Sequence, residues 1–184
     1  MQMEFVFAGF GGQGIMFVGQ VLAYAGMDTG LEVTWIPSYG PEMRGGTANC
    51  CVVLADRPIG SPVVHYPQVA VAFNNPSFEK YEPAIAPNGL LVYNSSMITL
   101  DRTRSDIEYL PVPATVIADE LGDMRLTNMV MLGAAISARP TLSLDAVKQA
   151  LDDHLPSHRR DLLEANFMAL ERGMACALNP AFTK

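Results

Sequence analysis

The sequence predicts an α/β fold with a mostly parallel open sheet, flanking helices, and helices enriched in the C-terminal half. Two observations lead to this prediction. A short apolar strand runs into a glycine cluster, then a helical pattern, then a second strand, an order typical of parallel sheets. From residue 115 onward, apolar residues recur three and four positions apart, which indicates helices. The 184 residues fit a single domain, 1–184.

The first half begins with a strand, a helix and a second strand. Residues 4–8 are rich in β-branched and aromatic side chains and predict a buried strand. A helix follows, with Gly30 placed to cap its C-terminus. Its apolar face is formed by Ile15, Val18, Leu22 and Ala25. Residues 33–36 predict the second strand.

Loops and short strands fill the middle of the chain. Residues 37–46 are dense in turn formers and are predicted as loop. Asn75 suits a helix N-cap and Pro76 the first helical position, with that helix ending near 87–89. Residues 95–106 are polar and are also predicted as loop. Further strands are predicted at 49–54, 69–73 and 90–94.

The second half predicts four helices. Ser143 and Ser157 are suitable start signals. The helical spacing covers residues 115–121, 126–138, 144–154 and 161–178.

The net charge of −7 argues against nucleic acid or an anionic membrane as the main partner. Arg44 is the first basic residue, so we expect an anion near the N-terminus to rely on backbone amides or on Arg44. The chain has no basic leader and no membrane-length apolar run, which predicts a cytoplasmic protein. Cys50, Cys51 and Cys176 match no iron–sulfur or zinc spacing and are predicted to be buried.

The glycine cluster satisfies G-x-G-x-x-G through Gly9, Gly11 and Gly14. Such a Rossmann-like turn places free amides and a partial positive charge at a helix N-terminus, where a phosphate or carboxylate binds. An ordinary NAD site is disfavoured because no acid ends the second strand, at residues 35–38. A P-loop is excluded because no lysine follows the last glycine. The alternative is a tight turn that only allows helix-on-sheet packing.

The loop after the second strand is expected beside the glycine cluster, because ligands sit outside the carboxyl ends of strands. Arg44 offers a fork of donors, and Tyr39 a flat face with a polar tip. The alternative makes Arg44 a partner of Glu42 or a surface charge. The chain has no catalytic motif for a hydrolase or zinc enzyme. Residues 158–160, His-Arg-Arg, are interpreted as a solvated helix start rather than an anion site.

Two motifs together carry a resemblance: Gly-Phe-Gly-Gly-Gln-Gly at 9–14 and Ser-Tyr-Gly-Pro-Glu-Met-Arg-Gly-Gly at 38–46. In this order and spacing the chain resembles the gamma subunit of 2-oxoacid:ferredoxin oxidoreductases. Segments 59–62, 69–74 and 89–95 agree with it. The resemblance implies oxidative decarboxylation of a 2-oxoacid with coenzyme A, giving acyl-CoA, carbon dioxide and reduced ferredoxin.

The resemblance also implies the partners. Thiamine diphosphate with Mg would sit on alpha and beta subunits, and the iron–sulfur clusters on beta or on a ferredoxin-like delta subunit. Gamma would bind none of these by itself, would be inactive alone and would help form the coenzyme A region. Its apolar surface allows a homodimer when the chain is isolated. The residues expected at the site are Gly9, Gly11, Gly12, Gln13, Gly14, Ser38, Tyr39, Gly40, Arg44, Gly45, Gly46 and Asn74.

The 38–46 motif favours the 2-oxoglutarate, pyruvate and branched-chain types over the indolepyruvate type, and the short chain favours 2-oxoglutarate. Pyruvate or branched-chain specificity remains an alternative. Another is an independent nucleotide-binding regulatory module, which would bind coenzyme A or an adenine nucleotide without partners. A free-standing NAD(P)-dependent enzyme is disfavoured by the missing acid.

The first prediction concerns Arg44. Arg44→Ala should lower turnover of the assembled complex, or raise its apparent KM for coenzyme A, because a planar cation is lost from a glycine-rich rim. The chain should remain folded. Steady-state kinetics of the complex test this, and unchanged kinetics would assign Arg44 to structure.

Overall fold

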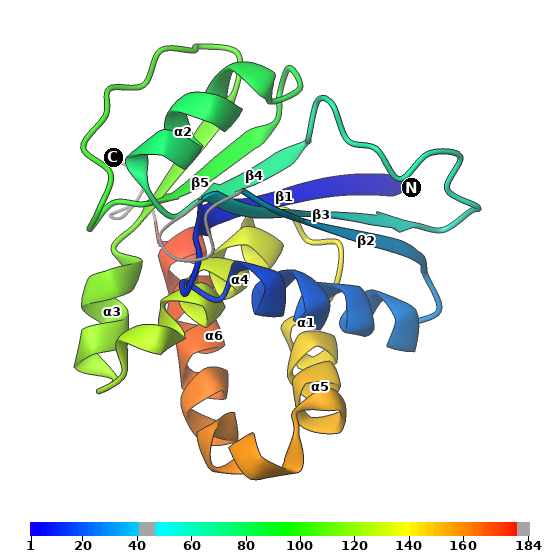
Figure 1. Ribbon diagram of the computed structural model, residues 1–184, viewed down its shortest axis with the longest axis vertical. Helices are drawn as coiled ribbons and strands as arrows, with labels where there is room; N and C mark the ends of the chain where they lie inside the picture. Colours follow the sequence, from blue (N-terminus) through cyan, green and yellow to red (C-terminus); the bar gives the residue numbers. More distant parts are fainter. Residues whose placement is uncertain (41–46, 180–184) are drawn as a thin grey trace.

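The computed structural model describes residues 1–40 and 47–179. Its centre is a six-stranded sheet in the order β2-β3-β1-β4-β5-β6 (Figure 1). The strands are β1 (Gln2–Phe10), β2 (Glu32–Tyr39), β3 (Thr47–Ala55), β4 (Val69–Ala72), β5 (Leu90–Asn94) and β6 (Glu108–Val112).

One strand runs against the others. The pairs β1–β4, β4–β5 and β5–β6 are parallel, whereas β3 is antiparallel to both β1 and β2. Because β3 is inserted between them, β1 and β2 point the same way without being neighbours. The predicted α/β class and mostly parallel sheet are confirmed. The reversed β3 had no signal in the sequence.

Helices cover both faces of the sheet unequally (Figure 1). The larger group lies on one face, and α2 with its following 3₁₀ turn η1 (Glu82–Ala84) lies on the other. The chain's helices are α1 (Ile15–Asp28), α2 (Asn75–Tyr81), α3 (Ala114–Glu120), α4 (Thr127–Ala138), α5 (Leu144–His154) and α6 (Leu163–Leu178). Two more 3₁₀ turns, η2 (Met124–Leu126) and η3 (Ser157–Leu162), precede α4 and α6.

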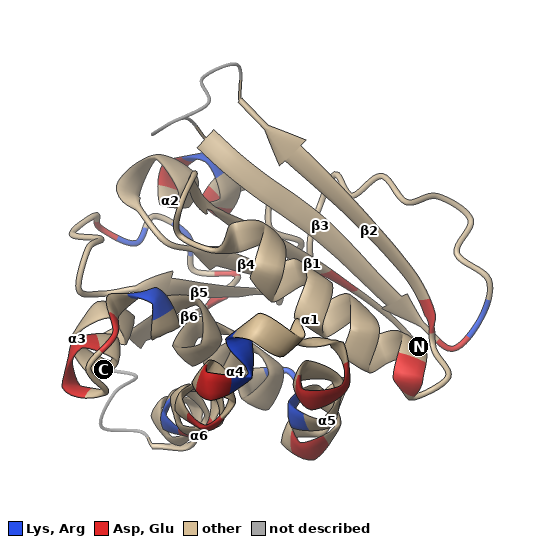
Figure 2. Ribbon diagram, turned by 60° about the horizontal axis from the view of Figure 1, so that its bottom comes forward, with Lys and Arg blue, Asp and Glu red and all other residues tan. Residues whose placement is uncertain are grey.

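Strand β4 shows why the two faces differ. Val69 and Val71 point into the main core beneath α1 and α4, whereas Ala70 and Ala72 join the smaller cluster around Phe78 of α2. Both faces of this strand are buried, which explains its unbroken apolar sequence. Figure 2 shows how few charged residues the sheet carries.

Several boundaries differ from the sequence prediction. Strand β2 continues to Tyr39, so residues 37–39 are strand rather than loop. Pro37 is tolerated there because β2 is an edge strand. The cap of α2 is Asn74, which accepts a hydrogen bond from the Ser77 amide, not Asn75. Helix α2 ends at Tyr81, before the predicted 87–89.

Strand β6 was not predicted at all. It contains Pro111 and lies at the other edge of the sheet. Two local predictions are confirmed: Gly30 adopts φ +82° after α1, and Ser143 caps α5 by accepting from the Ala146 amide. At Ser157 a 3₁₀ turn begins instead of an α-helix, and α6 follows at Leu163.

Helices α4 and α6 pack backbone against backbone through two glycines. A Cβ on Gly133 would overlap the carbonyl of Leu170, and a Cβ on Gly173 would overlap that of Val130. Neither clash can be relieved by a side-chain rotation, because both neighbouring atoms belong to the main chain. This close crossing holds the first turns of α4 and α6 beside each other.

Gly173→Ala should therefore destabilise the fold by about 1–3 kcal/mol, despite the better helix propensity of alanine. Trp35 is the chain's one tryptophan, and its fluorescence during urea unfolding would give the midpoint. Gly60→Ala is the control, because a Cβ there meets no atom within 4 Å. Equal midpoints for the two variants would contradict this account of the α4–α6 crossing.

Candidate functional site

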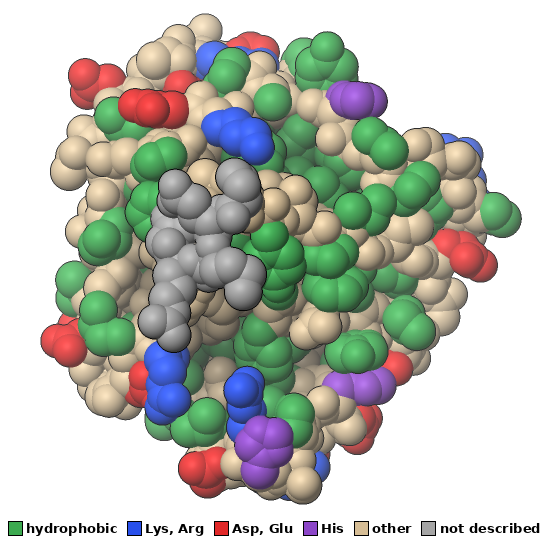
Figure 3. Space-filling view, viewed as in Figure 1, with side chains coloured by type: hydrophobic (Ala, Val, Ile, Leu, Met, Phe, Trp, Pro, Cys, Tyr) green, Lys and Arg blue, Asp and Glu red, His purple; other side chains and the backbone are tan. Residues whose placement is uncertain are grey.

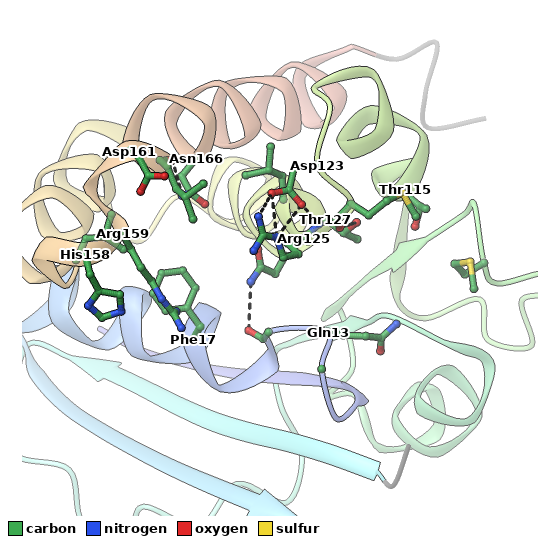
Figure 4. Close-up of a pocket in the computed structure, with 18 residues that line it drawn as sticks. Gln13, Phe17, Thr115, Asp123, Arg125, Thr127, His158, Arg159, Asp161 and Asn166 are labelled. Atoms are coloured by element: carbon green, nitrogen blue, oxygen red, sulfur yellow. Dashed lines mark hydrogen bonds and ion pairs between the residues drawn. The ribbon is translucent and has the colours of Figure 1, made fainter. Parts of the chain in front are cut away.

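A cavity of about 670 Å³ opens between the glycine loop and the C-terminal helices (Figure 4). This volume is within the usual range of small-molecule sites, roughly 300–1,000 Å³. The segment 123–128 contributes continuously to one wall. The cavity is lined by Gly12, Gln13, Gly14, Phe17, Met97, Thr115, Asp123, Met124, Arg125, Leu126, Thr127, Asn128, Leu155, His158, Arg159, Asp161, Leu162 and Asn166.

The glycine loop brings the start of α1 to this cavity. Gly12 and Gly14 adopt φ values of +96° and +75°, which other residues rarely accept. Gly14 is the N-cap of α1 and has no side chain to bond the first amides of the helix. Those amides and the helix dipole therefore favour an anion at this end.

Gln13 shapes the loop from within. Its Oε1 accepts a 2.7 Å hydrogen bond from the Phe10 amide and a 3.4 Å contact from Asn74 Nδ2. A Cβ on Gly9 would collide with Gln13 Oε1, so the first glycine provides space for this bond. Because Oε1 accepts these bonds, Nε2 is the donor group that this side chain has left, and Gln13 lines the cavity.

Asn128 joins the loop to the C-terminal half. Its Nδ2 donates to the Gly14 carbonyl at 3.4 Å, and a Cβ on Gly14 would overlap the same amide. Gly14 is thus required both by its positive φ and by the approach of α4. Asn128 was not among the predicted site residues, because 114 positions separate it from its partner and no local pattern connects them.

Two arginines supply positive charge to the cavity wall, and a histidine lies beside them. Arg125 makes hydrogen bonds of 2.7–3.0 Å with Asp123, and these bonds lower the pKa of the Asp123 carboxyl. Arg125 is nevertheless 77% exposed. Arg159 and His158 come from η3 and line the same cavity. Figure 3 shows basic and histidine side chains around the hollow between α3, α5 and α6.

This arrangement corrects one expectation. Arg44 was expected to be the one basic side chain available to an anion near the N-terminus, but Arg125 and Arg159 share a cavity with Gly12–Gly14. Both lie more than a hundred residues further along the chain. The His-Arg-Arg segment, interpreted as a solvated helix start, also contributes to the cavity wall through His158 and Arg159.

The structure separates the other predicted site residues. Gly9, Gly11 and Asn74 belong to the glycine loop and its support but do not line the cavity. Ser38 and Tyr39 end β2, and Gly40, which follows the strand, donates its amide to the Thr47 carbonyl at 2.7 Å. Thr47 also pairs with Phe10, which sets the end of β2 level with the end of β1. Arg44, Gly45 and Gly46 lie outside the described residues.

Within residues 1–40 and 47–179, no group of three or more His, Cys, Asp or Glu side chains could hold a metal ion. Burial raises the pKa of the Cys50 thiol to about 12 and also raises those of Cys51 and Cys176. Cys50 and Cys176 are buried as predicted, whereas Cys51 is half-buried. No helix in the same residues is long and apolar enough to cross a membrane.

Known proteins match this chain over nearly its whole length. Ketoisovalerate oxidoreductase subunit VorA of Methanothermobacter thermautotrophicus is 36% identical over 90% of the chain, which spans about a third (34%) of VorA. The 2-oxoglutarate synthase subunit KorC of Methanothermobacter marburgensis is 33% identical, over 94% of the chain and 95% of KorC.

Two solved structures share the fold. One is 2-oxoglutarate:ferredoxin oxidoreductase from Magnetococcus marinus with 2-oxoglutarate, coenzyme A and succinyl-CoA bound, at a TM-score of 0.87 and 28% identity. The match covers 96% of this chain and 31% of that one. The other is the keto/oxoacid ferredoxin oxidoreductase gamma subunit from Geobacter sulfurreducens, at a TM-score of 0.82 and 25% identity, covering 96% and 98%.

The family model of pyruvate ferredoxin/flavodoxin oxidoreductases matches residues 4–176. This match contains the whole sheet except the first two residues of β1, together with every wall of the cavity. The chain therefore belongs to the pyruvate ferredoxin/flavodoxin oxidoreductase family.

Proposed function

We propose that this chain is the gamma subunit of a 2-oxoacid:ferredoxin oxidoreductase and that its cavity binds coenzyme A. The observation that carries the proposal is the meeting of the α1 N-terminus with Arg125 and Arg159 at one cavity. Backbone amides and guanidinium groups are the donors that phosphates require. The coenzyme A bound to the Magnetococcus marinus relative supports the same assignment.

The cavity fits the chemistry of this ligand. Coenzyme A carries a diphosphate and a 3′-phosphate, and a chain of net charge −7 holds such an anion only where cations and amides gather. Phe17 and Leu155 add apolar surface to the same wall. In this assignment Gly9, Gly11 and Asn74 shape the loop, whereas Gly12, Gln13 and Gly14 face the ligand.

The rest of the reaction belongs to partner subunits. Thiamine diphosphate with Mg, held by alpha and beta subunits, would supply the decarboxylation, and iron–sulfur clusters would pass electrons to ferredoxin. This chain would hold the nucleotide end of coenzyme A and exclude water from it. The KorC relative supports 2-oxoglutarate as the 2-oxoacid. Ser38, Tyr39 and Gly40 would border the site where it meets a partner. Arg44, Gly45 and Gly46 remain assigned to the coenzyme A region on the resemblance alone.

Reconstitution tests the assembly. The isolated chain should not turn over any 2-oxoacid, whereas coexpression with its thiamine-binding partners should give coenzyme A-dependent reduction of a viologen dye. The rate should be highest with 2-oxoglutarate. Turnover by the chain alone would refute the subunit role, and a higher rate with pyruvate or a branched-chain 2-oxoacid would refute the substrate.

Arginine variants test the cavity. Arg125→Gln and Arg159→Gln should each raise the KM for coenzyme A up to about tenfold, since loss of one charge-assisted hydrogen bond costs about 1.4 kcal/mol. The KM for the 2-oxoacid should not change. The effect should shrink at high salt, because exposed charges are screened.

Arg57→Gln is the matched control, because Arg57 is exposed and lies outside the cavity wall. It removes the same charge from the chain without removing a donor from the site. An equal rise of KM in Arg57→Gln, or no rise in either cavity variant, would place coenzyme A elsewhere.

A further inference from the structure

Two buried asparagines face the cavity from neighbouring helices. Asn128 lies in the first turn of α4 and is 5% exposed, and Asn166 lies in the first turn of α6 and is 6% exposed. Both line the cavity. Buried polar side chains are costly unless their groups are paired, so each atom of these amides needs an explanation.

Both amide nitrogens have a hydrogen-bond partner within the protein. Asn128 Nδ2 donates to the Gly14 carbonyl at 3.4 Å. Asn166 Nδ2 donates to the Leu162 carbonyl at 2.7 Å (Figure 4 labels Asn166 at the cavity). These carbonyls fix the orientation of the side chains. A flipped amide would place its oxygen against a carbonyl oxygen, which is repulsive.

The amide oxygens differ from the nitrogens in this respect. In the described part of the chain neither Oδ1 has a hydrogen-bond partner. In the same residues, two side-chain polar atoms are inaccessible to solvent and lack a hydrogen-bond partner, namely Thr34 Oγ1 and Trp35 Nε1. Neither asparagine oxygen belongs to this group. The two oxygens are therefore accessible, and the opening that both residues line is the cavity. A ligand that displaces water here must offer N–H or O–H donors.

The position of these acceptors relative to the cations limits which part of a ligand can reach them. Asn128 follows Arg125 by three residues in the wall formed by 123–128, and Asn166 follows η3, which carries His158 and Arg159. The donors that reach the asparagines must therefore belong to the same part of the ligand as its phosphates. In coenzyme A that part is the nucleotide, with its ribose hydroxyl and base amino group close to the phosphates. The amides of the pantetheine arm lie further away.

We propose that Asn128 and Asn166 accept hydrogen bonds from the nucleotide half of coenzyme A and so determine specificity for it. This inference rests on the proposed coenzyme A site. The arginines attract any polyphosphate, whereas the two amide oxygens distinguish a donor-bearing nucleoside from other anions. Gln13 has the opposite role, because its free group is a donor suited to phosphate.

Competition kinetics in the assembled complex test the proposal. The probes are adenosine 3′-phosphate 5′-diphosphate, which is the nucleotide half, and 4′-phosphopantetheine, which is the arm. Asn128→Ala and Asn166→Ala should each raise the inhibition constant of the nucleotide about fivefold, equivalent to about 1 kcal/mol for one hydrogen bond. The constant for 4′-phosphopantetheine should stay the same.

The inhibition constant does not depend on the amount of folded enzyme, so partial unfolding does not imitate the result. Gln149→Ala is the control, because this amide lies on α5 outside the cavity wall and pairs with Asp153. An unchanged constant for the nucleotide in both variants would overturn the proposal. An equal rise for both probes would also overturn it, because it would indicate a displaced glycine loop.

The wild-type complex separates this inference from the proposed function. If neither probe competes with coenzyme A in the wild type, the coenzyme A site itself is misplaced. If both probes compete and their inhibition constants in the asparagine variants equal those of the wild type, coenzyme A binds at this site but the asparagines do not determine its recognition.

Discussion

The packing of Asn128 against Gly14 is the constraint on which the candidate site depends. It brings the first turn of α4 against the last residue of the glycine loop, where a side chain larger than glycine has no space. The cavity is the volume left around this contact, bounded by the loop on one side and by segment 123–128 on the other. Helix α6 completes it, because the glycine crossing at Gly133 and Gly173 fixes α6 directly beside α4.

The charge distribution follows from the same packing. Helix α1 contains a single charged residue, Asp28, at its C-terminal end. The glycine loop therefore has amides and a helix dipole but no cation of its own among the described residues. Arg125 and Arg159, from the second half of the chain, line the same cavity as this loop, and Asp123 holds Arg125 by paired hydrogen bonds. Two aspartates, Asp123 and Asp161, line the cavity together with the two arginines. Further acidic residues lie on α3, on α5 and at the end of α1 (Figure 2).

The sheet supports this arrangement without taking part in it. Alternating valine and alanine in β4 lets the large helices pack on one face and Phe78 of α2 on the other. The end of β4 then places Asn74 where its amide reaches Gln13, which in turn bonds the Phe10 amide. The glycine loop is held by its own strand, by the strand beside it and by α4. Such support from three elements keeps an anion site in shape before its ligand arrives.

The α/β class, the glycine loop and most helices could be read from the sequence, as could the resemblance to gamma subunits, which the family match and the relatives confirm. These features depend on local spacing: three-four repeats, glycines at a turn, and a serine before α5. Three features follow from the folded chain alone: β3 runs antiparallel between β1 and β2, β6 forms despite Pro111, and Arg125, Arg159, Asn128 and Asn166 line the same cavity as the loop. The physical reason is that strand order and helix packing join residues more than a hundred positions apart, through contacts that leave no periodic trace in the sequence.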